Sequence, residues 1–336
     1  MNYCIPFYIK IHSAFSLAKL TIFKENTNDY ILKKKKFGDG LVIKLCLKMK
    51  RRSFLKNTFG TLLTVFGLGS GGYFYANRIE PSLLEINHLE IKHSLIPTSF
   101  NGVKIVQFSD THLGFHYTIN QLKKLVDKIN QLQPDLIFFT GDLLDEPNKY
   151  NEINKVPPIL QQLKATIGKY CIYGNHDHGG YGSEIYKNLM EMSNFTLLLN
   201  ESLPIKQKDG SFISLLGIDD RMLGRPDLQL ALKHAPESSF KLLLSHAPDI
   251  ADEASAYQIH WQLSGHSHGG QVKIPFVGAL VIPPFAQNYP EGYYSIGEIN
   301  PLSLYVNRGI GTTRLPFRFM AKPELTVFTL ISTETD

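Results

Sequence analysis

Three apolar stretches, each ending abruptly in polar residues, constrain the fold more than any other feature of the chain. They cover residues 103–108, 136–139 and 169–173, and they end in Ser-Asp-Thr-His, Thr-Gly-Asp and Gly-Asn-His-Asp. A continuous apolar run between turn residues is typical of a strand buried on both faces. Apolar residues at helical spacing over 119–129, and a second helical stretch over 153–163, separate the three runs. The pattern therefore predicts a β-α-β-α-β unit with a parallel sheet.

The pattern changes after residue 178. Helix signals over 183–192 are followed by short strand signals near 195–199, 203–207 and 212–217, and further apolar runs occupy 240–244, 258–263 and 325–330. No internal repeat and no low-complexity linker interrupts residues 101–336. We therefore expect one α/β domain over 101–336, with a mainly parallel first half and a second sheet of mixed pairing.

Polar side chains follow five of the predicted strands, and in parallel sheets such positions meet at one edge. They are Asp110 and His112, Asp142, Asn175 and His176, His246, and His266 and His268. Taken singly, each also fits a turn or a helix cap. Taken together, these carboxylates, imidazoles and one amide, without a thiolate, suit divalent Mn, Zn, Fe or Co. The candidate ligands outnumber those of one tetrahedral site, and two ions sharing a carboxylate explain the surplus.

Charge is distributed unevenly along the chain. Residues 1–48 carry nine lysines against three acids, and residues 49–78 add five cations without an acid, so the total charge of +5 leaves −6 for residues 79–336. This acidic body gives no electrostatic reason to expect a nucleic-acid partner. Two of the three cysteines, Cys4 and Cys46, lie in the N-terminal stretch, so Cys171 has no partner for a disulfide within the body.

A signal-like segment begins at Met49. Residues 1–48 show no sustained period, and we interpret them as an N-terminal extension, either a disordered tail or sequence upstream of a true start at Met49. Lys50-Arg51-Arg52-Ser53-Phe54-Leu55-Lys56 and the uncharged residues 57–77 are typical of a twin-arginine signal over 49–78, with 57–77 as a membrane anchor. Residues 79–100 form a linker or first strand. We expect a protein exported by the twin-arginine machinery and held at the outer face of the cytoplasmic membrane, or in the cell wall or periplasm.

The ordered motifs resemble those of the calcineurin-like metallophosphoesterase family. The resemblance rests on Asp110-x-His112, Gly141-Asp142-x-x-Asp145, Gly174-Asn175-His176-Asp177, His246 and Gly265-His266-x-His268. It covers residues 100–330 and, with the twin-arginine-like start and Asn307-Arg308-Gly309, is strongest to the bacterial YaeI/YkuE-type phosphodiesterases. It implies a four-layer α-β-β-α sandwich of two mixed sheets, with a dimetal site at the carboxyl ends of the strands. Some relatives of that group cleave UDP-diacylglucosamine.

The resemblance also implies roles for individual residues. Asp110, His112 and His268 would bind one ion, Asn175, His246 and His266 the other, and Asp142 both. A hydroxide between the ions would attack the phosphorus in line with the leaving oxygen. His176 would protonate that oxygen, with Asp145 orienting the imidazole.

Substrate contacts are less constrained by the sequence. Arg221, Arg225, Arg308, Arg314 and Arg318 are candidate phosphate contacts, because Arg binds phosphate oxygens bidentately. Arg308 is favoured among them, and His116 and His178 follow metal motifs directly. An apolar region over 276–294 forms either sheet core or a wall that meets lipid or sugar.

Three functions are compatible with these residues. The first is a phosphodiesterase acting on a lipid or glycolipid phosphoester of the cell envelope, such as a UDP-diacylglucosamine-like pyrophosphate. The alternative is a phosphomonoesterase or nucleotidase. The third is a metal-binding scaffold without catalysis, which predicts eroded ligands that this sequence does not have.

Overall fold

The chain divides into two compact units. A computed structural model describes residues 2–11, 30–37, 40–178, 183–298 and 300–333. The units are Met1–Tyr73 and Phe74–Asp336. The boundary lies within the segment predicted as a signal.

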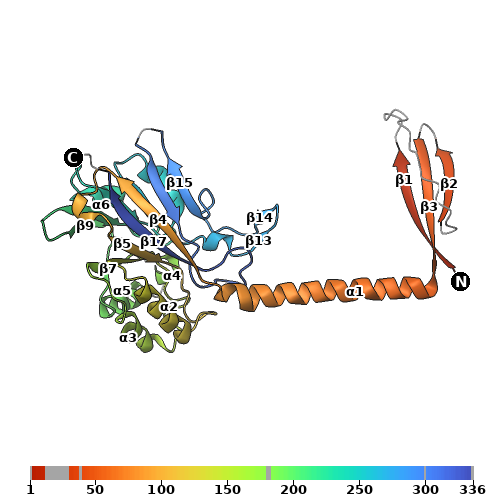
Figure 1. Cartoon of the computed structure of the whole chain (residues 1–336), viewed down its shortest axis with the longest axis horizontal. Helices are drawn as coiled ribbons and strands as arrows, with labels where there is room; N and C mark the ends of the chain where they lie inside the picture. The colour runs from red at the N-terminus through yellow and green to blue at the C-terminus, as the bar shows by residue number, and fades with distance from the viewer. Residues whose placement is uncertain (1, 12–29, 38–39, 179–182, 299, 334–336) are drawn as a thin grey trace. The chain divides into compact units, whose positions relative to one another are not determined.

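The N-terminal unit contains three strands and most of a helix (Figure 1). β1 (Asn2–Ile11), β3 (Gly40–Lys50) and β2 (Tyr30–Phe37) form an antiparallel sheet in that order. These strands have no counterpart in the sequence-based expectation, and the alternative starts at Met1 and Met49 stay a prediction. α1 (Arg51–Phe74) follows. Among the residues that the structure describes, no helix combines the length and the hydropathy that crossing a membrane requires.

The first sheet of the main unit contains the predicted parallel unit. Its strand order is β4-β17-β5-β6-β7-β8. Four of its strands run parallel to one another: β5 (Lys104–Phe108), β6 (Leu136–Phe139), β7 (Gly168–Cys171) and β8 (Thr196–Leu197). β17 (Glu324–Ser332) is antiparallel to β5, and β4 (Glu85–His93) is parallel to β17.

The second sheet is mixed, as predicted. Its order is β15-β16-β12-β11-β10-β9. Its four central strands are parallel: β10 (Phe212–Gly217), β11 (Lys241–Leu244), β12 (Trp261–Ser264) and β16 (Leu302–Val306). At the two edges, β9 (Glu201–Lys206) pairs antiparallel with β10 and β15 (Gly292–Ile296) pairs antiparallel with β16.

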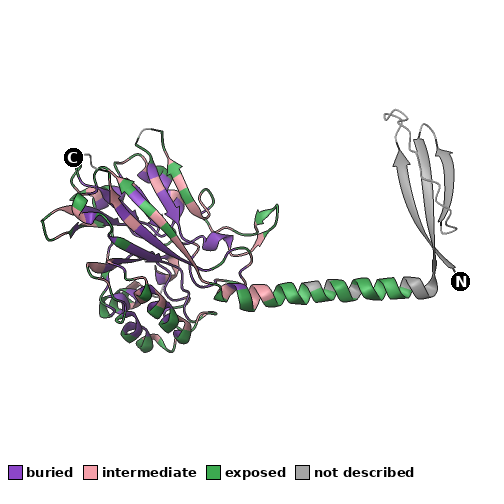
Figure 2. Ribbon diagram, in the orientation of Figure 1, coloured by how far each residue is buried: buried purple, intermediate pink, exposed green. Residues whose placement is uncertain are grey.

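Three apolar clusters lie between the layers, and the buried residues of the two sheets are purple in Figure 2. Alternate residues of β6 face opposite ways: Ile137 and Phe139 join the cluster beneath the helices, and Leu136 and Phe138 join the cluster between the sheets. The third cluster packs α6 and α7 against the second sheet. Burial on both faces explains why the central strands read as continuous apolar runs. The result is the predicted α-β-β-α sandwich.

The helices after α1 are at most 13 residues long. The helices of the first sheet's outer face are α2 (Ile119–Gln131), α3 (Val156–Leu160) and α5 (Ser183–Met192); the others are α4 (Asn175–His178), α6 (Leu228–Leu232) and α7 (Ala251–Ala254). Thr118 begins α2 as a capping box with Gln121. The helix predicted over 153–163 is shorter, because a 3-10 turn, Ile153–Lys155, precedes α3 and the α-helix ends at Leu160.

The structure contradicts the prediction that all of the apolar region over 276–294 is sheet core. Residues 276–281 do not enter the sheet core. They belong to a small hairpin of β13 (Lys273–Ile274) and β14 (Gly278–Ala279), and Phe276, Val277 and Leu280 are exposed. Tyr289 and Tyr294, in contrast, pack against the third cluster.

Candidate metal centre and active site

The ends of the parallel strands bring the predicted ligands together. Asp110 and His112 follow β5, Asp142 follows β6, and His266 and His268 follow β12. All five have positive φ angles, between 41° and 70°. Non-glycine residues rarely adopt this conformation, and it occurs preferentially where a functional geometry requires it.

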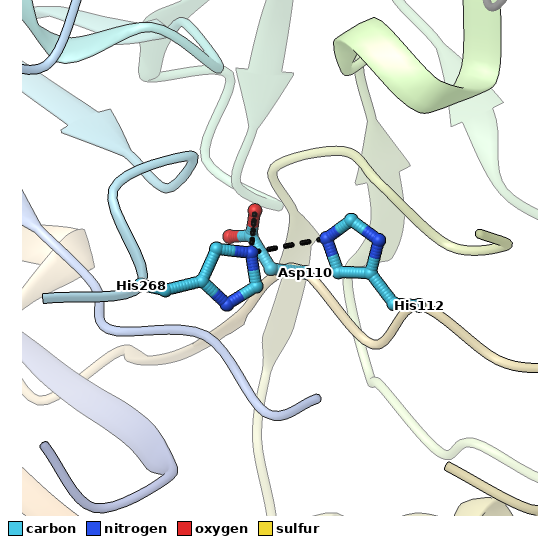
Figure 3. A group of neighbouring side chains, drawn as sticks. All are labelled: Asp110, His112 and His268. Atoms are coloured by element: carbon cyan, nitrogen blue, oxygen red, sulfur yellow. Dashed lines mark hydrogen bonds and ion pairs between the residues drawn. The ribbon is translucent and has the colours of Figure 1, made fainter. Parts of the chain in front are cut away.

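One group of ligands consists of Asp110, His112 and His268 (Figure 3). The Nε2 atoms of His112 and His268 lie 3.0 Å apart, and Asp110 Oδ1 lies 3.6 Å from His268 Nε2. All three residues are buried. Facing imidazole nitrogens next to a carboxylate are suited to enclosing a cation.

A second group consists of Asp142, His246 and His266. His246 Nε2 lies 3.2 Å from His266 Nδ1 and 3.3 Å from Asp142 Oδ2. These three residues are also buried. The resemblance implied that His246 and His266, together with Asn175, bind the second ion and that Asp142 takes the shared position.

Asp142 connects the two groups through a single oxygen. Its Oδ2 lies 3.3 Å from His246 Nε2 and 3.5 Å from His112 Nε2. Burial acts to raise the pKa of Asp142, but the surrounding histidines, His246 above all, outweigh it and hold the pKa well below its usual range. The carboxylate is therefore charged at neutral pH and able to serve both positions.

Hydrogen bonds on the outer side of three imidazoles fix which nitrogen faces inward. His246 Nδ1 donates to Thr140 O at 2.6 Å, and His266 Nε2 donates to Pro284 O at 2.9 Å. His112 Nδ1 lies 3.2 Å from Asp145 Oδ1. Such outer partners orient ligating histidines and set their tautomers.

Asn175 provides a test of whether metal ions fit. Its Oδ1 atom is buried and has no hydrogen-bond partner among the described residues. A buried amide oxygen without a partner is costly in a folded protein. The donor set beside it contains carboxylates and imidazoles, which divalent ions of intermediate hardness prefer. The residues therefore fit two divalent ions.

His176 forms a third group with His112 and Asp142 whose ligand atoms could hold a metal ion, although the resemblance gives His176 no role as a ligand. Its Nδ1 donates to Asp145 O at 2.8 Å, and its ring meets the His112 ring edge-on at 4.5 Å. Burial lowers the pKa of His176, but the charges of Asp142 and Asp145 outweigh burial and raise the pKa above its ordinary value. The surrounding carboxylates therefore favour the protonated form of the imidazole.

Asp145 contacts His176 through its backbone as well as through the expected carboxylate. Its backbone carbonyl, not its carboxylate, makes the short contact with His176, and the carboxylate lies 3.6 Å from His176 Nδ1. The same carboxylate is closer to the ligand His112. One residue thus orients both imidazoles, through two different groups.

A cavity opens at His176. It has a volume of about 540 Å³ and is lined by Asp145, Glu146, Pro147, Asn148, Lys149, Asn175, His176 and Leu223. Leu223 belongs to the loop after β10 and is 54% exposed. Because this loop comes from the second sheet, both sheets contribute to the space in front of the ligands.

Comparisons with known proteins agree with this geometry. A family model described as calcineurin-like phosphoesterase matches residues 103–270. The chain is 49% identical to the metallophosphoesterase YkuE of Bacillus subtilis, over 85% of this chain and 99% of that protein. The chain belongs to the calcineurin-like phosphoesterase family. It is a hydrolase of phosphoric esters that depends on divalent metal ions.

Two more distant relatives extend this comparison. The phosphoesterase is 27% identical to the UDP-2,3-diacylglucosamine pyrophosphatase LpxG of Chlamydia muridarum, over 76% of this chain and 92% of that protein. It is 29% identical to a transmembrane protein with metallophosphoesterase domain of Danio rerio, over 82% of this chain and 62% of that protein.

The predicted substrate contacts lie in varied settings. Arg308 forms ion pairs with Glu85 at 2.6 Å and Glu324 at 2.8 Å. His116 is exposed and contacts the ring of Phe115. These internal partners account for the position of Arg308, and its role toward substrate stays a prediction, as does that of His116.

His178, the last residue of α4, links this helix to the segment that follows β10 of the second sheet. Its Nε2 lies 2.5 Å from Asp219 Oδ1, and its ring stacks on Tyr173. Burial lowers the pKa of His178, but the hydrogen bond and charge of Asp219 outweigh burial and raise it. The role of His178 toward substrate also stays a prediction.

Two residues without a predicted structural role hold the site together. Asp177 accepts backbone N–H bonds from Asp142, Leu143 and Gly174, at 2.7 to 3.1 Å. Its place in the Gly-Asn-His-Asp motif was the only sequence feature that indicated this role.

Arg318 was predicted as a phosphate contact, and that prediction is wrong. Its side chain is fully buried and donates to the carbonyl oxygens of Gly311, Ala321 and Arg308.

Proposed function

We propose that this phosphoesterase is a phosphodiesterase that acts on a lipid- or glycolipid-linked phosphoester of the cell envelope. The observation that carries the proposal is the cavity at His176, which combines the Lys149 ammonium, paired with Glu146 at 3.0 Å, with the exposed apolar side chain of Leu223. A phosphoester joined to an acyl chain needs both kinds of contact. The similarity to relatives named for a UDP-2,3-diacylglucosamine pyrophosphatase supports the same substrate class.

His176 is the proton donor in this proposal. Its Nδ1 is engaged by Asp145 O, so Nε2 is the nitrogen available to the leaving oxygen. The carboxylates of Asp142 and Asp145 raise the pKa of His176, which favours the proton-donating form. Bound divalent ions supply the positive charge that neutralises phosphate oxygens and lowers the pKa of water. Asp110, His112, Asp142, Asn175, His246, His266 and His268 would hold them.

A substrate comparison on the full chain tests this proposal. Rates are measured with Mn²⁺, Zn²⁺, Fe²⁺ and Co²⁺ on bis-p-nitrophenyl phosphate, on p-nitrophenyl phosphate, on UDP-2,3-diacylglucosamine and on UDP-N-acetylglucosamine. The last compound is the matched control, because it has the pyrophosphate without the acyl chains. We expect the diester to be preferred over the monoester and the acylated pyrophosphate over the soluble one. Equal rates on the last two would exclude a lipid substrate.

The phosphomonoesterase or nucleotidase alternative predicts the opposite order for the two p-nitrophenyl esters. The scaffold alternative predicts no turnover with any metal. It is disfavoured because the ligand set is complete and the family is one of phosphoesterases.

We also propose export by the twin-arginine machinery, to the outer face of the cytoplasmic membrane or to the cell wall or periplasm. The support is the sequence from Met49 to Lys56, with the pair Arg51-Arg52. Replacing both arginines by lysine should retain the protein inside the cell, as measured by protease accessibility in intact cells. Unchanged accessibility would contradict the proposal.

A further inference from the structure

The three most exposed large apolar residues among those described in the main unit, Phe276, Val277 and Val281, lie in one small hairpin segment that follows the metal ligand His268. β13 and β14 follow His268 by a few residues (Figure 1). Phe276 at the tip is fully exposed, and Ile274, Val277, Leu280 and Val281 are between 42% and 73% exposed (Figure 2). Together with Leu315 these residues are called the apolar hairpin patch. Monomeric soluble proteins seldom expose contiguous apolar groups of this kind without an interaction to explain them.

The hairpin is joined to the loop that contains Leu315. Lys273 N donates to Phe319 O, and Phe319 N donates to Gln271 O, both at 2.9 Å. Gln271 also donates to the carbonyl oxygens of Thr313 and Leu315. The patch is therefore attached to the domain by an ordered base, and its position relative to His268 is fixed.

The backbone at the tip is strained. Phe276 has a φ of 67°, in the left-handed region that glycine and asparagine adopt at lower cost. A bulky aromatic residue here forms no part of any described core cluster. Strain without a packing reason points to a role for the projecting side chain.

We propose that the apolar hairpin patch docks the domain onto an anionic lipid surface. Residues 274–286 read Ile-Pro-Phe-Val-Gly-Ala-Leu-Val-Ile-Pro-Pro-Phe-Ala, without one charged or hydrogen-bonding side chain. An interface with another protein ordinarily includes polar groups at its rim. A segment that enters the acyl region needs none, provided its backbone is paired.

The backbone of the hairpin meets this requirement. Val277 N donates to Ile274 O, and Leu280 N donates to Val272 O, both at 3.0 Å. The ladder pairs Lys273 with Ala279 and Ile274 with Gly278. The hairpin therefore exposes apolar side chains while many of its polar backbone groups are satisfied internally.

Cations flank the patch on the side of its base. Arg314 precedes Leu315, and Lys322 follows the same loop; both are exposed. Arg78 is exposed in a short π-helix, Tyr75–Ile79, in which Ala76 O accepts from Arg318 N and the Asn77 side chain donates to Pro316 O. Among the described residues, none of the three cations forms an ion pair. Apolar anchors beside unpaired cations match the chemistry of an anionic membrane surface.

Docking of this kind would place the metal site at the lipid surface, since His268 lies directly before the hairpin. The inference goes beyond the proposed function and does not depend on it, because vesicle binding is measured without turnover. The enzyme could act on a soluble substrate and still dock through the hairpin. The substrate comparison tests the first property, and vesicle binding tests the second.

The test uses a fluorescent reporter in the full chain. The Phe276→Trp variant is mixed with vesicles of phosphatidylglycerol and phosphatidylcholine, some with brominated acyl chains. The protein has one native tryptophan, Trp261, which is buried and gives a constant background. We expect a blue shift and quenching by the brominated lipid. The Leu230→Trp variant is the matched control, because Leu230 is 49% exposed on α6, away from the hairpin, and its emission should not change.

Two further variants separate the apolar contribution to vesicle binding from the electrostatic one. Phe276→Ser should lower vesicle affinity about tenfold, and its folding is checked by unchanged thermal unfolding. Lys322→Gln should lower affinity about fivefold on anionic vesicles and leave binding to pure phosphatidylcholine unchanged. Unquenched Phe276→Trp emission on vesicles that bind the protein would overturn the proposal. So would a Phe276-dependent dimer in analytical ultracentrifugation without vesicle binding.

Discussion

Replacing the buried Arg318 by methionine should weaken both the fold and the first group of ligands. The guanidinium donates to Gly311 O at 2.9 and 2.6 Å, to Ala321 O at 2.8 Å and to Arg308 O at 2.9 Å. Burial lowers the pKa of Arg318 only to about 10, so the side chain is charged at neutral pH. Methionine fills similar volume and leaves three buried carbonyl oxygens without this donor.

The expected cost follows from these contacts. An unsatisfied buried carbonyl costs about 1–3 kcal/mol, and removing one partner of a buried charged network costs about 3–5 kcal/mol. Relief from burying a charge offsets part of the sum, so we expect a loss of about 4 kcal/mol. For a domain of this size that lowers Tm by about 8–16 °C.

Arg318→Met should also weaken metal binding, and it should affect the two groups of ligands unequally. The loop held by Arg318 supports the first group, because Ile310 N donates to Ser109 O and Gly311 N to Asp110 O, at 3.0 and 2.7 Å. Arg318 itself lies 3.4 Å from His268 Nδ1. We therefore expect weaker binding of one metal ion in Arg318→Met, with the ion at His246 and His266 less affected.

The assay combines calorimetry of the metal-free protein with a metal titration. Arg221→Met is the matched control, because Arg221 is half exposed and pairs with Glu253 only at 3.7 Å; we expect less than about 0.5 kcal/mol there. Arg318→Lys keeps the charge but not the planar fork, and should fall between wild type and methionine. An Arg318→Met protein that unfolds at the wild-type temperature would refute the reasoning.

Two further predictions concern histidines near the cavity. His176→Ala should lower turnover by roughly 10²–10⁴-fold while both metal ions stay bound; wild-type turnover in that variant, measured beside its metal content, would remove His176 from the reaction. The His178–Asp219 pair should stabilise the fold most between pH 3.8 and 6.5, the ordinary pKa values of the two groups. His178 has a raised pKa, so its contribution is complete below 6.5 and is lost as pH rises through the raised value; Asp219 has a lowered pKa, so its contribution is lost as pH falls through that value. The difference in unfolding free energy between wild type and His178→Gln should therefore shrink above pH 6.5, and a difference that stays constant from pH 5 to pH 9 would contradict the pairing.

The ligand groups could be predicted because two simple rules coincide in them. Strands buried on both faces appear as apolar runs, and a parallel sheet collects the residues that follow them. Asp110, Asp142 and His246 were identified in this way, and the structure places them together. The four layers followed from the resemblance, and the three apolar clusters confirm them.

The sequence was a poor guide where side-chain direction decides the outcome. Arg318 and Arg308 have the same chemistry in the sequence, yet one is fully buried on carbonyl oxygens and the other pairs with two glutamates. Asp145 was expected to act through its carboxylate, and its backbone carbonyl makes the closer contact with His176. Composition and spacing carry no information about such directions.

The hairpin shows a different limit. Residues 276–281 are as apolar as a buried strand, and only their position in space distinguishes the two. Turn residues at Pro275 and Gly278 indicate a hairpin, but they do not say whether it packs inward. Exposure of an apolar segment is a property of the tertiary structure.

We infer that Asp142 would serve two metal ions at once, because its Oδ2 faces both groups of ligands. The most direct test is the number of Mn²⁺ ions per chain, measured by elemental analysis after equilibrium dialysis, at a concentration that fills the wild type. We expect two ions in the wild type, about one in His112→Ala, and fewer than one in Asp142→Asn, because one oxygen of Asp142 faces both groups. Two ions per chain in Asp142→Asn, or a single ion in the wild type, would contradict the account.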